Sequence, residues 1–175
     1  MILLIKTNKE TLHDLEFVKP IEDILKKDYK VVEYKNLKKA DLGKADKIII
    51  SGTSIKDNEF LKELEKFYWI KDYNKPILGI CAGAQIIGLV CKGKLLKKPE
   101  IGMTKINFEK IFLGVFGEKQ VYELHNNYVR FSEDFLSFAN NEIQQAVKHK
   151  QKEIYAVLFH PEVGNKEMIR EFVKI

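Results

Sequence analysis

The sequence predicts a three-layer α/β fold, with a mostly parallel sheet covered by helices on both faces and a small antiparallel excursion. Short apolar runs of strand length alternate with segments whose apolar residues recur at helical spacing. This βαβα order is typical of parallel sheets, because a crossover helix must return the chain before the next parallel strand. The residues suited to chemistry follow the strands, at the edge where open α/β sheets build their sites.

The first elements follow this alternation. A strand is expected over residues 2–6, followed by a helix in which Pro20 is tolerable only in the first turn. The apolar face of that helix comprises Phe17, Val18, Ile21, Ile24 and Leu25. Residues 30–34 and 46–51 predict two further strands. A second helical pattern, which indicates core packing rather than a binding stripe, comprises Phe60, Leu61, Leu64, Phe67 and Tyr68.

The next strand and helix surround Cys81, the most informative residue of the chain. Residues 76–80 are apolar on both faces with proline only at the first position, as expected of a buried parallel strand, and a helix is expected over 82–91. The small residues that permit a sharp turn between them are Gly79, Ala82 and Gly83. Such a nucleophile elbow raises the sulfur above the sheet and brings helix N–H groups near it, which favours the reactive thiolate.

The remaining chain predicts an antiparallel excursion and a return to the sheet. Short extended segments are expected from about Gly93 to His125, around Gly102, Gly114 and Gly117. Strands over 143–149 and 153–159 then lead to a closing amphipathic helix, whose apolar residues are Met168, Ile169, Phe172 and Val173. The sequence has no internal repeat, linker or low-complexity tract, so a single domain over residues 1–175 is expected.

Composition argues against several classes of protein. The net charge of +5 is nearly all lysine scattered among glutamates, whereas nucleic-acid sites concentrate arginine beside aromatics, so no nucleic-acid partner is expected. No apolar stretch approaches a membrane span and the start is too short for a signal peptide, so no membrane partner and a cytoplasmic location are expected. Cys81 and Cys91 cannot bridge within one helix, which favours a reducing compartment.

A second strand-like run ends in His160-Pro161-Glu162. In an extended chain, residues two apart point the same way and lie about 6.6 Å apart, so Glu162 can orient one ring nitrogen of His160. Pro161 limits how far the pair can drift. An imidazole oriented by a carboxylate and presented to the thiol of Cys81 follows the triad logic of cysteine hydrolases.

Other site chemistries are less well supported. His125 could compete with His160 as the base, but it has no carboxylate two residues later, and its neighbours Asn126 and Asn127 suit a turn. A metal site from Cys81, His125, His160 and Glu162 lacks a close ligand pair such as CxxC or HxxxH. No metal and no cofactor are therefore expected.

Residues 79–85 and 159–163, in this order and spacing, resemble the class I (triad) glutamine amidotransferases over essentially the whole chain. The resemblance implies a flavodoxin-like sheet, a Cys81, His160 and Glu162 triad, and L-glutamine as substrate. It also implies an oxyanion hole made by the backbone N–H groups of Gly52 and Ala82. The residues that it assigns to substrate binding are Thr53, Gln85, His125, Asn126 and Asn127.

The oxyanion loop departs from the family pattern. Thr53 stands where the family has a second glycine, and Ser54 replaces a proline. A β-branched residue would be costly if position 53 requires a positive φ. Ala84 replaces the His or Met found in many relatives. Together these changes put the shape of the glutamine pocket in question.

The resemblance implies hydrolysis of glutamine to glutamate and ammonia through a Cys81 thioester. No part of the chain is left to use the ammonia, so a separate, ATP-dependent synthetase subunit is expected in trans. The motifs are most similar to the free-standing glutaminase subunit of archaeal-type GMP synthases, which makes GMP synthetase the first partner to test. Two alternatives stay open: a stand-alone amidotransferase or amidohydrolase with another acceptor, and a catalytically impaired regulatory module.

Overall fold

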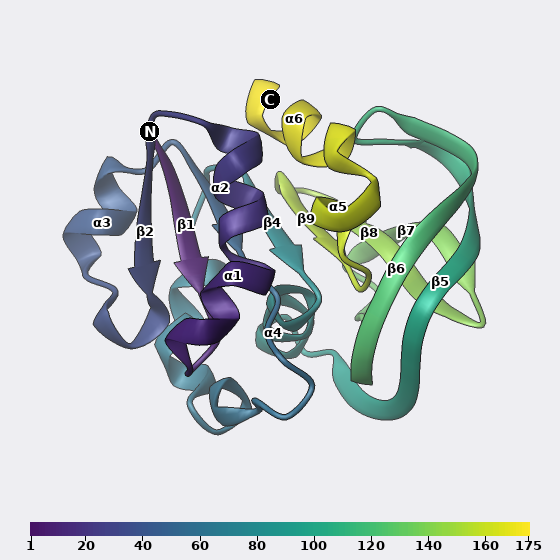
Figure 1. Cartoon of the computed structure of the whole chain (residues 1–175), viewed down its shortest axis with the longest axis horizontal. Coiled ribbons are helices and arrows are strands. Elements are labelled where there is room, and N and C mark those ends of the chain that lie inside the picture. Colours follow the sequence, from purple (N-terminus) through teal and green to yellow (C-terminus); the bar gives the residue numbers. More distant parts are fainter.

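One nine-stranded sheet runs through the computed structural model, which describes residues 1–175 (Figure 1). The strands are β1 (Ile2–Lys6), β2 (Tyr29–Glu33), β3 (Lys47–Ile50), β4 (Ile77–Ile80), β5 (Lys94–Phe112), β6 (Val115–Arg130), β7 (Phe135–Asn141), β8 (Ile143–His149) and β9 (Ile154–Val157). The α-helices are α1 (Asp14–Phe17), α2 (Lys19–Leu25), α3 (Lys39–Lys44), α4 (Ala82–Val90), α5 (Pro161–Gly164) and α6 (Lys166–Lys174). The spatial order of the strands across the sheet is β2-β1-β3-β4-β9-β8-β7-β5-β6.

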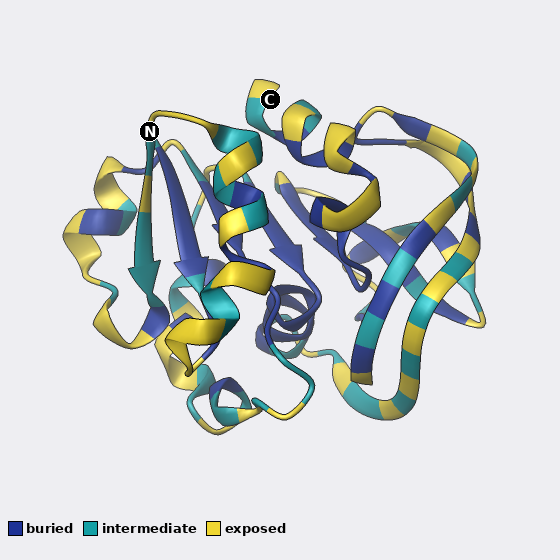
Figure 2. Ribbon diagram, viewed as in Figure 1, coloured by how far each residue is buried: buried dark blue, intermediate teal, exposed yellow.

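The parallel half of the sheet comprises β2, β1, β3, β4 and β9. Its short apolar strands supply two cores, because successive side chains point to opposite faces: Leu3 and Ile5 join one core and Leu4 the other. Helix α4 covers the first face and is apolar and buried almost all round (Figure 2), as a helix enclosed in a core must be. Helices α2 and α6 cover the second face. The expected three-layer α/β fold is therefore confirmed.

The antiparallel half, β5 to β8, is larger than the sequence indicated. Strands β5 and β6 form one long hairpin of 19 and 16 residues instead of short segments. Gly114 lies at its turn, but Gly102 and Gly117 lie inside the strands with positive φ values of 116° and 73°. The expectation that the chain divides into short segments around these two glycines was wrong, because glycine with a positive φ also occurs inside irregular, twisted strands. In Figure 2, exposed residues alternate with partly buried ones along most of β5, and buried residues recur at alternate positions along part of β6.

Two helical expectations also change in detail. The helix expected after β1 is divided at Val18 into α1 and α2, with Pro20 in the first turn of α2. The pattern from Phe60 to Tyr68 forms two 3₁₀ helices, η3 (Glu59–Lys62) and η4 (Leu64–Lys71), and η4 still packs against α4. None of the helices combines the length and the apolar character that crossing a membrane would require.

Candidate active site

Cys81 occupies a strained turn between β4 and α4. Its φ of 49° and ψ of −101° lie outside the regions that a non-glycine residue ordinarily adopts, and its N–H donates to the carbonyl of Val157 at 2.8 Å. Such strain persists only where the surroundings over-determine it, as at functional sites. The expected elbow is therefore present, with the cysteine at its apex.

Two glycines let α4 begin directly on the sheet. A Cβ added to Gly83 would lie 2.3 Å from the carbonyl oxygen of Ile50 in β3, and one on Gly79 would lie 2.6 Å from the backbone of Gly83. No side chain fits at either position without moving backbone. The small residues around Cys81 thus fix the start of α4 against β3 and β4, which holds the elbow in place.

His160 and Glu162 lie together, but in a conformation that the sequence did not indicate. His160 Nδ1 is 2.7 Å from Glu162 Oε1, and both side chains are buried. Strand β9 has already ended at Val157, and Pro161 begins α5, so the expected extended geometry is wrong. The reason is that the fixed φ of proline suits the first helical position, which turns Glu162 back toward the ring.

The surroundings of His160 set its charge. Phe17 and Tyr122 lie beside the ring, with centroid distances of 5.5 Å and 6.3 Å. Burial opposes protonation, but Cys81 and Glu162 outweigh it and hold the pKa of His160 well above its ordinary value. The buried Nε2 makes no hydrogen bond. One ring nitrogen is thus occupied by Glu162, and the other is free for chemistry.

Gly52 marks the point where the nucleophile and the imidazole converge. A Cβ placed there would lie 2.6 Å from His160 Cε1 and 3.4 Å from Cys81 Cβ. The loop that carries Gly52 is held from behind, since Thr7 Oγ1 lies 3.1 Å from the carbonyl oxygens of both Ser51 and Gly52 and shares its one hydrogen between them. The Ser51 carbonyl and the Gly52 N–H belong to the same trans peptide group and point in opposite directions. Because that carbonyl faces Thr7, the N–H of Gly52 faces away from Thr7.

Two backbone donors beside the thiol are unused within the fold. The N–H groups of Gly52 and Ala82 donate to no backbone carbonyl. Ala82 is the first residue of α4, where the helix itself offers no acceptor. Both N–H groups are therefore available to an anionic ligand atom next to Cys81.

A small pocket opens on the other side of Cys81. Gln85 Nε2 donates to the carbonyl of Asn127 at 3.0 Å, and Asn126 Nδ2 donates to the carbonyl of Ile55 at 3.2 Å. The structure thus brings together all five residues expected to bind substrate, since the lining includes Thr53, Gln85, His125, Asn126 and Asn127. Thr53 does not adopt a positive φ, so the cost considered for a β-branched residue at this position does not arise.

Sequence reasoning missed three residues near this site, which are Glu123, Glu100 and Thr7. His125 Nε2 lies 3.0 Å from Glu123 Oε2 and 3.4 Å from Glu100 Oε2. No carboxylate follows His125 by two residues, but Glu123 precedes it by two. Residues two apart in an extended strand lie on the same face, so the sequence could have predicted this pair. Glu100 comes from another strand, and Thr7 contacts a loop 44 residues away, so neither had a local signal.

Comparison with known proteins gives a consistent result. The sequence matches the model of the family described as Glutamine amidotransferase class-I over residues 18–174. A protein of Thermoplasma acidophilum, named as a glutamine-hydrolyzing subunit of GMP synthase, is 36% identical over 149 residues, 78% of this chain and 74% of the relative. The protein of the same name from Saccharolobus solfataricus is 30% identical over 181 residues, 98% of this chain and 88% of the relative.

Solved structures share the fold. The structure of a protein from Thermoplasma acidophilum, described as belonging to a GMP synthase, superposes with a TM-score of 0.83 at 28% identity, covering 99% of this chain and 93% of the other. A glutamine amidotransferase from Thermotoga maritima, 18% identical, superposes with a TM-score of 0.73 over 99% of this chain and 81% of the other. At that identity the second likeness concerns the fold alone.

Proposed function

The chain belongs to the class-I glutamine amidotransferase family, and from that premise we propose that it is the glutaminase subunit of a two-subunit GMP synthase. Cys81 is the nucleophile, His160 the general base and acid, and Glu162 the residue that orients His160. The relatives named as glutamine-hydrolyzing subunits of GMP synthase, at 36% and 30% identity, support the choice of GMP synthase. L-Glutamine is then the substrate and a synthetase subunit the partner.

The reaction begins with attack by the Cys81 sulfur on the side-chain carboxamide carbon of glutamine. The raised pKa of His160 makes its imidazole a strong acceptor for the thiol proton of Cys81, and transfer of that proton gives the thiolate nucleophile and an imidazolium. As the C–S bond forms, the carbonyl oxygen becomes an oxyanion between the N–H groups of Gly52 and Ala82. Each such donor is typically worth about 3–4 kcal/mol of transition-state stabilisation.

Collapse of this intermediate breaks the C–N bond. His160 donates its Nε2 proton to the departing nitrogen, so ammonia leaves and a glutamyl thioester remains on Cys81. The neutral imidazole then takes a proton from water, whose oxygen attacks the thioester carbon. Breaking the C–S bond releases glutamate and restores the thiolate and imidazolium, with Glu162 holding the ring in one orientation throughout.

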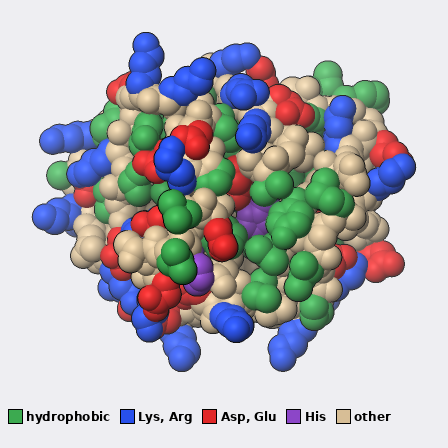
Figure 3. Space-filling model, in the orientation of Figure 1, with side chains coloured by type: hydrophobic (Ala, Val, Ile, Leu, Met, Phe, Trp, Pro, Cys, Tyr) green, Lys and Arg blue, Asp and Glu red, His purple; other side chains and the backbone are tan.

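A partner is supported by the surface beside the thiol. Ile101 and Met103 on β5 are 65% and 52% exposed, and they lie opposite Leu124 and Tyr122 of β6. The carbonyl of Leu124 accepts from Cys81 Sγ at 3.6 Å. Figure 3 shows hydrophobic side chains gathered over this hairpin half of the molecule. Apolar patches of this kind are typical of protein interaction sites, and docking here would adjoin the point where ammonia leaves.

The observation that carries the proposal is the convergence of Cys81 and His160 beside Gly52. We expect a glutamine analogue with a diazoketone in place of the amide to alkylate Cys81 and to leave Cys91 unmodified, as mapped by mass spectrometry. Cys91 is the matched control because burial raises its pKa and it lies at the far end of α4. Labelling of Cys91, or of neither thiol, would contradict the assignment.

The partner is tested separately. Glutamate release is measured for the chain alone and during titration with an archaeal-type GMP synthetase subunit, with and without its nucleotide substrates. Acceleration by the synthetase is the expected result. Full activity that no synthetase changes would favour a stand-alone amidohydrolase. Inactivity under every condition, together with no labelling of Cys81, would favour a regulatory module.

A further inference from the structure

A second group of ionisable side chains lies on the hairpin β5–β6, apart from Cys81 and His160. Glu100, Glu123 and His125 each offer one ligand atom, and these three atoms lie within 4.8 Å of one another. From their arrangement we propose that the hairpin holds a divalent cation of the zinc type. This inference does not depend on the proposed glutaminase function.

Strand register builds the group. Glu100 of β5 lies directly opposite His125 of β6, and directly opposite residues in an antiparallel pair project to the same face. Glu123 precedes His125 by two positions and therefore shares that face. The register shifts between Lys97 and Glu100, and this bulge brings Glu100 into line with the imidazole.

Burial leaves the carboxylates incompletely satisfied. The side chains of Glu123 and His125 are 0% and 1% exposed, and Glu123 contacts no cationic group except that imidazole. Glu123 Oε1 is enclosed and has no hydrogen-bond partner. Glu100 Oε2, the oxygen facing His125, is likewise enclosed and without a hydrogen-bond partner. Unpaired oxygens of buried carboxylates are costly, so they indicate a ligand.

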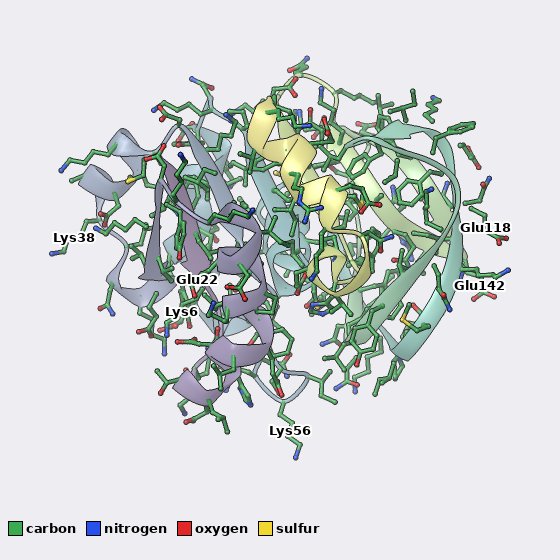
Figure 4. All side chains as sticks on the ribbon, turned by 45° about the horizontal axis from the view of Figure 1, so that its top comes forward. Lys6, Glu22, Lys38, Lys56, Glu118 and Glu142 are labelled. Carbon is green, nitrogen blue, oxygen red and sulfur yellow. The ribbon has the colours of Figure 1, made fainter.

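A proton on the imidazole explains only part of this arrangement. His125 Nε2 carries at most one hydrogen, yet it faces carboxylate oxygens at 3.0 Å and 3.4 Å. Lys98 does not fill the gap, because its Nζ contacts the other oxygen of Glu100, Oε1, at 3.1 Å. It also pairs with Glu142 at 2.9 Å, at the outer edge of the hairpin in Figure 4. Glu123 Oε1 and Glu100 Oε2 are thus left without a cationic partner other than the imidazole.

The donor set selects the kind of cation. One imidazole nitrogen with two carboxylate oxygens suits Zn²⁺ better than Mg²⁺ or Ca²⁺, which prefer oxygen alone. In a tetrahedral zinc site the ligand atoms lie about 3.3–3.6 Å apart, near the spacings around Nε2. Glu100 is 18% exposed and is therefore the ligand nearest to solvent, although its Oε2 is enclosed. A bound ion would clamp β5 to β6 around Leu124, whose carbonyl contacts the thiol.

The test is titration of the full-length Cys81→Ser chain with Zn²⁺ in a calorimeter, since this substitution removes the competing thiol of the active site. One equivalent is expected to bind, and Glu123→Gln in the same background should weaken binding by at least about 10²-fold. Glu100→Gln tests the same ligand set at a position that reaches the surface, in case Glu123→Gln does not fold. Glu118→Gln is the matched control on the same hairpin, because the Glu118 side chain is 64% exposed and pairs with Lys105 instead of the group.

Substitution of Co²⁺ gives an independent readout of geometry. Intense visible absorption bands, typical of tetrahedral cobalt, are expected in the Cys81→Ser chain and should disappear with Glu123→Gln or Glu100→Gln. Failure to bind Zn²⁺, or binding that neither glutamate substitution weakens, would overturn the proposal. Either result would leave a shared proton as the explanation of the group. Labelling of Cys81 by the glutamine analogue would be unaffected by that outcome.

Discussion

Two buried histidine–glutamate pairs lie near Cys81, each with its members two residues apart. In one pair His160 Nδ1 contacts Glu162 at 2.7 Å, and in the other His125 Nε2 contacts Glu123 at 3.0 Å. The first pair leaves Nε2 of His160 without a hydrogen bond, on a ring that interacts with Cys81. In the second pair Nε2 is enclosed between Glu123 and Glu100, so only Nδ1 remains unpartnered.

This difference favours a catalytic role for the His160 pair and a structural role for the His125 pair. A general base needs one nitrogen held by a carboxylate and the other directed at the nucleophile, and only His160 meets that condition. His125 lines the pocket, but its Nε2 is committed to the two carboxylates and fixes the hairpin instead. A similar spacing in sequence thus gives unlike chemistry, because Glu162 lies on a helical turn and Glu123 on a strand.

The strongest test of this comparison is the same substitution in both histidines. We expect His160→Gln to lower kcat by about 10⁶-fold, because it removes the proposed base and acid, and His125→Gln to stay within roughly 10-fold of the wild type. Glutamine keeps an N–H that can face Glu162 or Glu123, so neither variant removes the hydrogen-bond donor of its paired glutamate. Steady-state glutamate release in the presence of the synthetase measures both. Equal losses would mean that the base has been assigned to the wrong histidine.

The glutamates give the second test. Glu162→Gln removes the charge that orients His160, and we expect a loss of about 10⁴-fold, smaller than removal of the base. Glu123→Gln should change kcat by less than about 10-fold, since Glu123 pairs with His125 and not with His160. The same assay serves, with circular dichroism to show that both variants are folded. A larger loss from Glu123→Gln than from Glu162→Gln would reverse the comparison.

Space around the base is probed by Gly52→Ala. The added Cβ would lie 2.6 Å from His160 Cε1, so the ring must move and kcat should fall on the order of 10²-fold. Gly43→Ala is the control, because Gly43 lies exposed in α3 with no atom within 4 Å of its added Cβ. That variant should keep full activity and gain about 0.5–1 kcal/mol of folding stability. An active Gly52→Ala enzyme would show that His160 does not work from its present position.

The oxyanion loop gives a smaller effect. Thr7→Val removes the hydroxyl that holds the carbonyls of Ser51 and Gly52 while nearly conserving volume. We expect kcat to fall by roughly 10-fold with little change in KM, because the N–H of Gly52 acts on the transition state rather than on bound substrate. Thr7→Ser restores the hydroxyl and should recover most of the rate. An increase in KM alone would place Thr7 in substrate binding instead.

These tests also separate what the sequence could predict from what it could not. The elbow at Cys81 and the pairing of His160 with Glu162 follow from neighbouring residues, so local patterns were sufficient. The position of Glu100 depends on hairpin register and a bulge, and the contact of Thr7 with Ser51 joins segments far apart in the chain. Such contacts are set by tertiary pairing. The length of β5 and β6 was missed for a related reason, since a glycine in a strand resembles one in a turn.

The smallest expected effect is a change in the pH at which His160 titrates. Burial opposes the charge on His160, yet Cys81 and Glu162 raise its pKa well above the ordinary value of about 6.5. A group with a raised folded-state pKa stabilises the fold below its unfolded pKa, and this contribution disappears as pH rises through the folded value. Cys81→Ala removes one of the two raising interactions, so we expect the His160 midpoint to fall and this contribution to be lost at lower pH.

Imidazole NMR resonances followed across pH measure that shift directly. His149 provides an internal control, because burial lowers its pKa and it lies near Cys91, at the opposite end of α4 from Cys81. Its midpoint should stay below about 6.5 in both proteins. An unchanged His160 midpoint in Cys81→Ala would mean that the thiol and imidazole do not interact in the resting enzyme. The ion pair would then have to form only after glutamine binds, and Glu162 alone would account for the raised pKa of His160.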